Sequence, residues 1–329
     1  MKAILLLLSL LFSFLTPLKA LDQINERLLE HAQQYHDSTG NLADLVDYLI
    51  SAADNQRQQA EVIYYWISQN ISYDIESLLD GSYLTDTADV WRSRKGVCED
   101  YATLYKRMAE LAGLECYVVR GYAVGYDYNG ASPFEGINHS WNVVLVSGKF
   151  RFIDSCWGSG GIYSDGDEPQ FVPLMQLQYV MIPVAASLPS HLPGDPMWQF
   201  RNRPYSIKDF VAGIQPSQSE TIPSSIKDEL LRYQSLTQAG KDIQTYTNTY
   251  KYHQTDQNLL RLILAYQHAG YALLQEEPSQ GEIKRAALCY KRSAKLISKL
   301  KTQTDMSRRL ADDAKIGFEY AKYLHKNRT

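Results

Sequence analysis

The sequence predicts an α+β domain followed by an all-α region that extends to the end of the chain. Apolar residues recur at helical spacing from residue 22 to about residue 111, with one polar interruption. The spacing then changes to the period of two that is typical of strands, over residues 115–157. Helical spacing returns beyond residue 224. Helices followed by an antiparallel sheet are characteristic of the α+β class.

Three helices are expected first, over residues 22–36, 41–53 and 55–69, and residues 72–93 are predicted to be polar and irregular. A strong fourth helix begins at Gly96-Val97-Cys98. Gly113 follows its last apolar residue and is a good C-terminal stop. The apolar stripe of this helix consists of Val97, Tyr101, Leu104, Met108 and Leu111.

Strands are predicted over residues 115–124, 139–146 and 150–157, with a turn at Ser147-Gly148-Lys149 joining the last two. Residues 183–223 are rich in Pro, Ser and Gln, and are expected to form a long arm and a linker. The remaining helices are predicted as a hairpin, 259–274 with 283–297, and a last helix over 306–324.

The first twenty residues have the pattern of an export signal. Lys2 is the basic start, Ala3 to Leu15 is apolar, and Ala20 is a small residue suited to cleavage. We therefore expect an exported protein, periplasmic or extracellular, without an integral membrane segment after cleavage. The predicted domains are a signal peptide (1–20), N-terminal helices (21–54), a catalytic domain (55–200), a linker (201–223) and a C-terminal helical region (224–329).

Charge and cysteine content exclude several classes of protein. The formal net charge is −4, and it becomes −6 once Lys2 and Lys19 are removed. A mildly acidic chain without a Lys/Arg-rich run predicts no nucleic-acid partner. Four cysteines are too few for a disulfide framework and lack the paired spacing of a zinc site, although a Cys116–Cys156 disulfide is possible. No cofactor and no metal are expected.

Cys98 is the candidate nucleophile. It lies in the first turn of its helix, where free backbone N–H groups and the helix dipole stabilise an anion. The thiolate is the nucleophilic form of cysteine, and this position favours it. The simpler alternative is a small buried residue, since free cysteine is among the most buried residue types.

His139 and Asp154 are the candidate base and the residue that orients it. Both lie on the predicted hairpin, and a four-residue loop from Val146 to Lys149 would make Asp154 the diagonal neighbour of His139. A two-residue turn at Gly148-Lys149 would separate them further. A carboxylate among aromatic residues is costly unless it is paired, and histidine is its natural partner. Taken singly, His139 could be a core histidine and Asp154 a strand-end cap.

Three motifs around these residues resemble the transglutaminase-like superfamily. They are Arg94 to Ala102, His139 to Val144 and Phe152 to Gly158, and they occur in the order that the family shows. The resemblance is strongest to the kyphoscoliosis-peptidase-like branch of this superfamily. The stretches His191 to Gln199 and Tyr65 to Asp74 also resemble segments of that branch. The resemblance covers residues 58–210. It implies a papain-like α+β core with a Cys-His-Asp triad, carried here by Cys98, His139 and Asp154.

Other residues are weaker candidates. Trp141 and Trp157 could line the substrate cleft, although core packing is the more ordinary role for tryptophan. His191 is expected to lie in a loop. The acidic group Asp165, Asp167 and Glu168 lacks the full calcium-loop spacing and is interpreted as a solvated loop.

Two functions from different classes remain open. In the first, the chain is a cysteine peptidase, an amidase or a transglutaminase that attacks amide bonds of peptides or proteins, with hydrolysis favoured over cross-linking. In the second, it is a catalytically silent binding module that recruits a protein partner through its cleft or its C-terminal helices. A zinc or calcium protein is a third hypothesis with little support.

Overall fold

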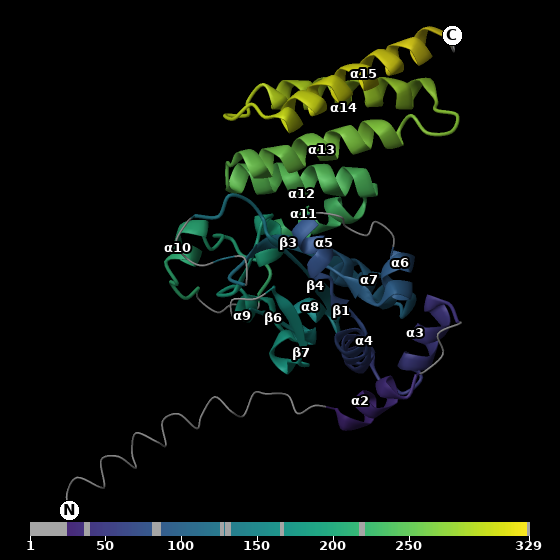
Figure 1. Ribbon diagram of the computed structural model, residues 1–329, viewed down its shortest axis with the longest axis vertical. Coiled ribbons are helices and arrows are strands. Elements are labelled where there is room, and N and C mark those ends of the chain that lie inside the picture. The colour runs from purple at the N-terminus through teal and green to yellow at the C-terminus, as the bar shows by residue number, and fades with distance from the viewer. Residues whose placement is uncertain are drawn as a thin grey trace, which may run out of the picture. The chain divides into compact units, whose positions relative to one another are not determined.

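The computed structural model describes residues 25–35, 40–80, 87–125, 128, 133–164, 168–216 and 221–327 (Figure 1). The predicted signal peptide therefore lies outside the described residues. The chain divides into two compact units, one formed by residues 1–118 with 140–183 and the other by residues 119–139 with 184–329. Both units are discontinuous, because the chain passes between them at residues 118, 139 and 183.

The described elements confirm the α+β class. They occur in the order α2 (Glu26–Gln33), α3 (Leu42–Ile50), α4 (Gln56–Asn70), β1 (Ser72–Tyr73), α5 (Ile75–Asp80), α6 (Thr87–Ser93), β2 (Lys95–Gly96), α7 (Cys98–Leu111), β3 (Glu115–Ala123), β4 (His139–Val146), β5 (Lys149–Ile153), α8 (Ser155–Ser159), β6 (Gly160–Tyr163), β7 (Gln170–Pro173), η2 (Leu177–Tyr179), β8 (Ile182–Pro183), α9 (Val184–Ser187), β9 (His191–Pro193), η3 (Pro196–Gln199), α10 (Ile207–Val211), α11 (Ser224–Gln234), α12 (Gln238–Tyr252), α13 (Asp256–Ala272), α14 (Gln280–Ile297) and α15 (Asp305–Asn327).

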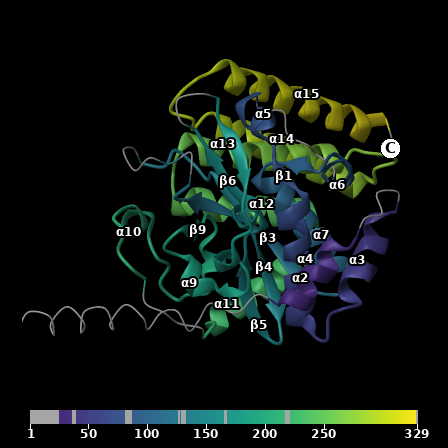
Figure 2. The ribbon, with the colours of Figure 1, turned by 60° about the horizontal axis from the view of Figure 1, so that its bottom comes forward.

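The main sheet has five strands among the described residues, in the order β8-β5-β4-β3-β9. The pairs β3–β9, β4–β5 and β5–β8 are antiparallel. One face of β4 and β5 shares a core with α2, α3, α4 and α7 (Figure 2). Val144, Val146 and Ile153 are the residues that β4 and β5 contribute to that core.

The predicted helices of the first unit are present, and α4 lies at its centre. The side chains from Ala60 to Ser68 are all buried, so this helix is covered on every side. Side-chain caps begin all three N-terminal helices, because Asn25, Asn41 and Asn55 each accept a hydrogen bond from the first turn that follows.

Three sequence predictions were wrong. Residues 72–93, expected to be irregular, include α5, α6 and strand β1, which pairs in parallel with β2. Residues 154–157, expected to continue a strand, instead begin α8. Within 183–223, β9 pairs with β3 and is therefore a part of the sheet rather than of an arm. Short elements escape periodicity arguments because they have too few residues to repeat.

In the second unit, α12, α13, α14 and α15 pack in chain order, each against the next (Figure 1). The predicted hairpin corresponds to α13 and α14, and the predicted last helix to α15. Tyr290 of α14 is packed between two glycines: an added Cβ would lie 2.9 Å from its ring at Gly270 and 2.3 Å at Gly317. These glycines let the helices approach closely. No helix in the described ranges combines the length and apolarity needed to cross a bilayer.

A buried carboxyl in the second unit gives a testable pH dependence. Asp195 is 1% exposed and accepts hydrogen bonds from the Met197 backbone N–H (3.0 Å) and the Asn248 amide (3.1 Å). Burial raises the pKa of Asp195 to about 7, and these two bonds oppose the rise. Between the unfolded value of 3.8 and about 7, the folded state holds a proton that the unfolded state has lost. The free energy of unfolding should therefore fall as the pH rises through this window.

Asp195→Asn should reduce this slope, because asparagine keeps the oxygen that accepts from Met197 but carries no ionisable proton. Urea unfolding at several pH values between 4 and 7 measures it. The exposed Asp228 provides the control, since Asp228→Asn should leave the slope unchanged. An identical slope in the wild type and in Asp195→Asn would contradict the assignment of the proton to Asp195.

Candidate active site

Cys98 is the first residue of α7, and the backbone around it is held firmly. Val97 is the N-cap in an extended conformation, and its N–H donates to the Asp100 carboxylate at 2.8 Å. The Asp100 N–H returns a bond to the Val97 carbonyl at 2.9 Å. Glycine is required at position 96, because an added Cβ would lie 2.6 Å from the Asp100 Cβ. The half-buried Cys98 thiol is free.

Asp100 lies two residues after the candidate nucleophile, in the first turn of the same helix. Burial raises the pKa of this carboxyl to about 6, and its hydrogen bond from Val97 works against that rise. Glu99 and Asp74 raise it further through charge repulsion. The carboxyl therefore gains its proton within the mildly acidic range, and the charge beside the first turn of α7 then changes.

Arg94 anchors the segment that leads into Cys98. Its guanidinium lies 4.0 Å from the ring centre of Trp91 and 4.6 Å from that of Trp66. Such cation–π contacts stabilise a positive group within an aromatic environment. Burial also lowers the pKa of Arg94. Its carbonyl accepts the Ser72 N–H at 2.9 Å, so the strand pair β1–β2 fixes the approach to α7.

The hairpin of β4 and β5 has the register that a diagonal His139–Asp154 pair needs. Val146 pairs with Lys149, and Asn142 with Ile153. The turn between them has two residues, Ser147 (φ 49°) and Gly148 (φ 76°), which are both left-handed as tight hairpin turns require. Extending the register by one residue sets Asp154 opposite Trp141. Asp154 is then diagonal to His139, the first residue of β4.

Two hydrogen bonds join β4 to α7. The Ser140 hydroxyl donates to the Glu99 carboxylate at 2.6 Å, and the Asn142 amide donates to the Ala102 carbonyl at 2.9 Å. Ser140 follows His139 and Glu99 follows Cys98. The start of the strand is therefore tied to the first turn of the helix, directly beside both candidate residues.

Asp154 is 1% exposed and directly follows β5. Its Oδ1 accepts the backbone N–H of Cys156 at 2.9 Å and of Trp157 at 3.0 Å, which makes it the N-cap of α8. The capping role considered from sequence is therefore real. It also orients the carboxylate, because a side chain that accepts two backbone bonds cannot rotate freely.

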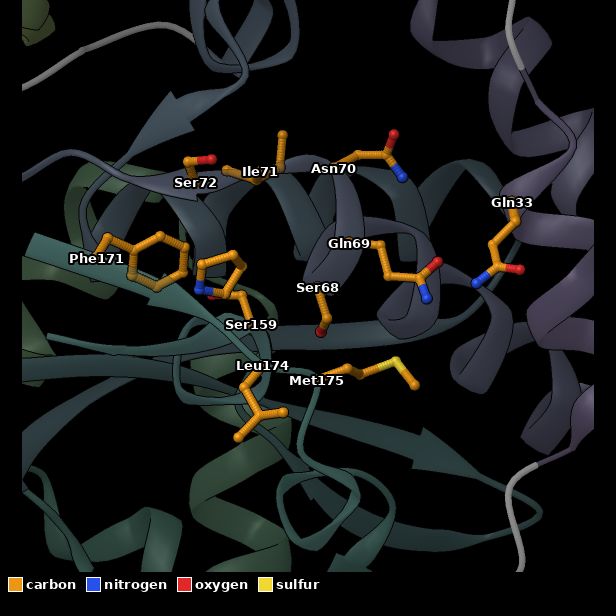
Figure 3. Close-up of a pocket in the computed structure, with 11 residues that line it drawn as sticks. Gln33, Ser68, Gln69, Asn70, Ile71, Ser72, Ser159, Phe171, Leu174 and Met175 are labelled. Carbon is orange, nitrogen blue, oxygen red and sulfur yellow. The ribbon is translucent and has the colours of Figure 1, made fainter.

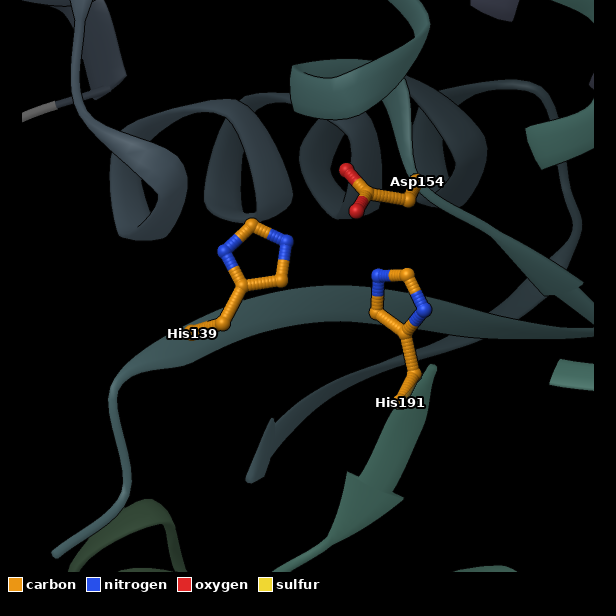
Figure 4. A group of neighbouring side chains, drawn as sticks. All are labelled: His139, Asp154 and His191. Atoms are coloured by element: carbon orange, nitrogen blue, oxygen red, sulfur yellow. The ribbon is translucent and has the colours of Figure 1, made fainter. Parts of the chain in front are cut away.

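A second histidine belongs to this neighbourhood. Ligand atoms of His139, Asp154 and His191 all lie within 4.8 Å of one another, and all three residues are buried (Figure 4). The two imidazole rings are 5.5 Å apart between centres. Asn138, the residue before His139, is fixed in place because its side-chain amide both donates to and accepts from the Ala123 backbone.

His191 was expected in a loop, and this prediction was wrong: the residue is in β9, is fully buried and contacts the Ser190 hydroxyl through Nδ1 at 2.8 Å. In the sequence, only the family-like stretch from His191 to Gln199 could have pointed to a role for this histidine. Two histidines and a carboxylate are also a set that can bind zinc. Elemental analysis of the purified chain tests that reading.

The remaining candidates have different environments. Trp141 is buried against Phe152, with ring centres 6.3 Å apart. Trp157 is half-buried and packs edge-to-face on Tyr179. Of the acidic loop group, Asp165 and Asp167 lie outside the described residues and Glu168 is exposed.

All four cysteines are free, so the possible Cys116–Cys156 disulfide does not form in this structure. Burial raises the pKa of the Cys156 thiol, and the charges of Asp154 and Cys98 raise it further. Cys156 is therefore a protonated second thiol close to the first.

Comparisons with known proteins agree on one family. A model of the transglutaminase-like superfamily matches residues 43–155. Kyphoscoliosis peptidases of Mus musculus and Homo sapiens are 32% identical over 187 residues, covering 56% of this chain and 28% of each relative. The Lim and transglutaminase domain protein ltd-1 of Caenorhabditis elegans is 27% identical over 185 residues, covering 53% of this chain and 25% of that protein.

The chain thus spans about a quarter of the length of these three curated relatives. A solved structure described as that of a TGase has a TM-score of 0.30 and 19% identity, covering 48% of this chain and 40% of that one. Residues 43–155 of the chain therefore match the transglutaminase-like superfamily, and the chain is similar to the kyphoscoliosis peptidases over 187 residues.

Proposed function

We propose that the protein is an exported thiol acyl-transfer enzyme that attacks amide bonds of peptides or proteins. The observation that carries this proposal is the pair of hydrogen bonds joining β4 to the first turn of α7. The first bond holds Ser140, the residue after the candidate base, against Glu99, the residue after the candidate nucleophile. The second ties Asn142 to Ala102 one turn further along α7. Such a preset geometry is what nucleophilic catalysis by a thiol requires.

In this mechanism the Cys98 thiolate attacks the amide carbonyl, and His139 carries the proton. Backbone N–H groups at the start of α7 stabilise the oxyanion. The C–N bond breaks, the amine leaves with the proton from His139, and a thioester remains on Cys98. Asp154 keeps Oδ1 on α8. In the proposed mechanism its second oxygen, Oδ2, holds the His139 imidazole.

The second half of the reaction depends on the acceptor. Water, deprotonated by His139, attacks the thioester and releases a carboxylic acid, which makes the enzyme a peptidase or amidase. An amine acceptor would instead leave a new amide bond, as in a transglutaminase. We favour hydrolysis, because the relatives with 32% identity are named peptidases.

Alkylation by iodoacetamide at neutral pH tests the nucleophile. Cys98 should label faster than Cys289, which is also half-buried but whose pKa is raised by burial. His139→Ala should slow the labelling of Cys98 and leave that of Cys289 unchanged. Peptide mass spectrometry resolves the two sites. Labelling of Cys98 no faster than a free peptide thiol would overturn the proposal.

A second candidate function is recruitment of a protein partner by the C-terminal helices. Residues 280–329 contain 13 Lys and Arg against 5 Asp and Glu, whereas the preceding 279 residues contain 20 against 32. Lys284, Lys291 and Lys295 are exposed on α14, at spacings that place them along one side of the helix, and Lys299 is exposed two residues after its end. This distribution favours an acidic partner.

Poly-L-glutamate is a suitable probe for this basic face. Wild-type protein should bind it at low salt, and added salt should weaken the binding, because exposed charges are screened. Lys284→Glu/Lys295→Glu should weaken binding several-fold in fluorescence anisotropy. Lys208→Glu/Lys227→Glu makes the same change of net charge at exposed positions elsewhere and should have a smaller effect. Equal losses in the two variants would point to net charge alone.

A further inference from the structure

A pocket of about 460 Å³ lies in the first unit, beside the C-terminal end of α4 (Figure 3). Its walls come from the α4–β1 junction, from strand β7 and the residues after it, and from Gln33 and Ser159. The volume is within the range of small-ligand sites in proteins. The pocket is lined by none of Cys98, His139, Asp154 or His191, so it is a feature additional to the thiol site.

The lining has a polar side and an apolar side, and none of its eleven residues is ionisable. Ser68, Gln69 and Asn70 bring hydroxyl and amide groups from α4, while Leu174 and Met175 are apolar. An anion would lose its hydration here without gaining a positive partner.

The polar side is rich in hydrogen-bond acceptors, because α4 ends there. A continuing helix would supply N–H groups of residues 72 and 74 to the carbonyls of Ser68 and Asn70. The Ser72 N–H instead donates to the Arg94 carbonyl at 2.9 Å, and the Asp74 N–H to the Gly96 carbonyl at 3.0 Å. The end of α4 also carries the negative end of the helix dipole, which favours a cation.

Side chains add further acceptors to this side. The Asn70 amide N–H₂ donates to the Trp66 carbonyl at 2.9 Å, which uses one of its two N–H groups, and its oxygen can accept a hydrogen bond. The Ser68 hydroxyl is 96% buried and makes no hydrogen bond of ordinary geometry within the described residues. Burial raises the pKa of nearby Tyr64 and Ser68 opposes that rise, but the Tyr64 hydroxyl donates to the Gln176 carbonyl.

The ligand that fits carries a positive donor group at one end and an aliphatic stem behind it. We propose that this pocket binds a lysine side chain of a protein or peptide, with its ammonium at the end of α4 and its methylenes against Phe171, Leu174 and Met175. A purely apolar ligand would leave the acceptors of α4 unpaired, which is costly. The ammonium has three donors and no acceptor, so it matches an acceptor-rich wall.

One buried residue connects the pocket with the candidate nucleophile. The Tyr101 hydroxyl donates to the carbonyl of Ile71 at 2.6 Å and accepts from the Ser159 hydroxyl at 3.2 Å. Ile71 and Ser159 both line the pocket, and Tyr101 lies one turn after Cys98 on α7. The pocket would therefore hold a lysine of the protein whose amide bond is attacked; this last step alone rests on the proposed function.

A methyl NMR titration of the full chain, with ¹³C-methyl methionine, tests the binding. The probe is Nα-acetyl-lysine N-methylamide, and the Met175 signal is assigned by its loss in Met175→Leu. We expect a saturable shift at Met175 and no comparable shift at the other methionines. The norleucine analogue has the same stem without the ammonium, and it should not saturate. Equal binding of both amides, or no shift at Met175, would overturn the proposal.

Variants of Gln69 test the sign of the preferred charge. Gln69 is exposed at the rim of the pocket, so substitution there should not disturb the fold. Gln69→Glu should tighten lysine binding about twofold to fivefold, as an exposed ion pair does. Gln69→Lys should weaken it by a similar factor. Affinities unchanged in both variants would contradict the proposal. The iodoacetamide labelling of Cys98 is measured separately, so failure of the pocket and failure of the thiol chemistry are distinguishable.

Discussion

Replacing Cys98 with alanine should abolish acyl transfer, with a loss on the order of 10³-fold or more, because Cys98 forms the thioester and the neighbouring Cys156 thiol is buried with a raised pKa. Alanine is small and favours helices, so α7 should remain folded. The measurement compares the exported proteome of wild-type and Cys98→Ala cells by mass spectrometry. New peptide termini that vanish in the variant indicate hydrolysis, and isopeptide links that vanish indicate cross-linking.

Cys289→Ala provides the matched control. Cys289 is a free, half-buried cysteine on α14, whereas Cys98 begins α7. This variant should keep the wild-type set of products. If Cys98→Ala keeps them as well, the thiol mechanism fails, and the binding-module hypothesis becomes the better account of the chain.

The long helices were predictable from sequence because each repeats its pattern over several turns. The predicted helix 41–53 is observed as Leu42–Ile50, and the predicted 306–324 as Asp305–Asn327. In the helices α4, α7, α13 and α14 the apolar stripe is buried as the spacing indicates. What sequence could not provide was the position of short elements such as β1, β2 and β9, which are defined by their partners in space.

The end of β5 shows why the site itself was harder to predict. Period-two spacing of Phe150, Phe152, Asp154 and Cys156 favoured a strand to residue 157. Asp154 interrupts it by accepting two backbone N–H groups, and this local competition begins α8. The sequence left two registers open for the hairpin. The left-handed Ser147 and Gly148 decide between them, and a turn conformation of this kind is not visible in a hydrophobic pattern.

Gly158→Ala should destabilise the protein strongly, although alanine favours a helix more than glycine does. By helix propensity alone, this substitution stabilises by about 1 kcal/mol. An added Cβ at position 158, however, would lie 2.1 Å from the hydroxyl oxygen of Tyr64 and 2.5 Å from its Cζ. Tyr64 is fully buried, so it cannot simply turn toward solvent. Overpacking of this kind costs about 1–3 kcal/mol and sometimes more.

The clash would also disturb the position of Asp154 in the candidate triad. The Gly158 N–H donates to the Asp154 carbonyl, and the Gly158 carbonyl accepts the Gln176 N–H, both at 2.9 Å. The Gln176 carbonyl in turn accepts the Tyr64 hydroxyl. If Tyr64 yields, that bond breaks. If α8 yields, the Asp154 carboxylate moves with it, because the same helix holds its Oδ1. Either way, Cys98 labelling and stability should fall together.

Gly161→Ala is the matched control, since the same methyl three residues later meets no heavy atom within 4 Å. Its midpoint in urea unfolding should stay close to that of the wild type, whereas the midpoint of Gly158→Ala should drop. Tyr64→Phe combined with Gly158→Ala should recover part of the loss, because the closest clashing atom is then absent. A Gly158→Ala protein as stable as Gly161→Ala would mean that the contact between α8 and Tyr64 does not set the position of Asp154.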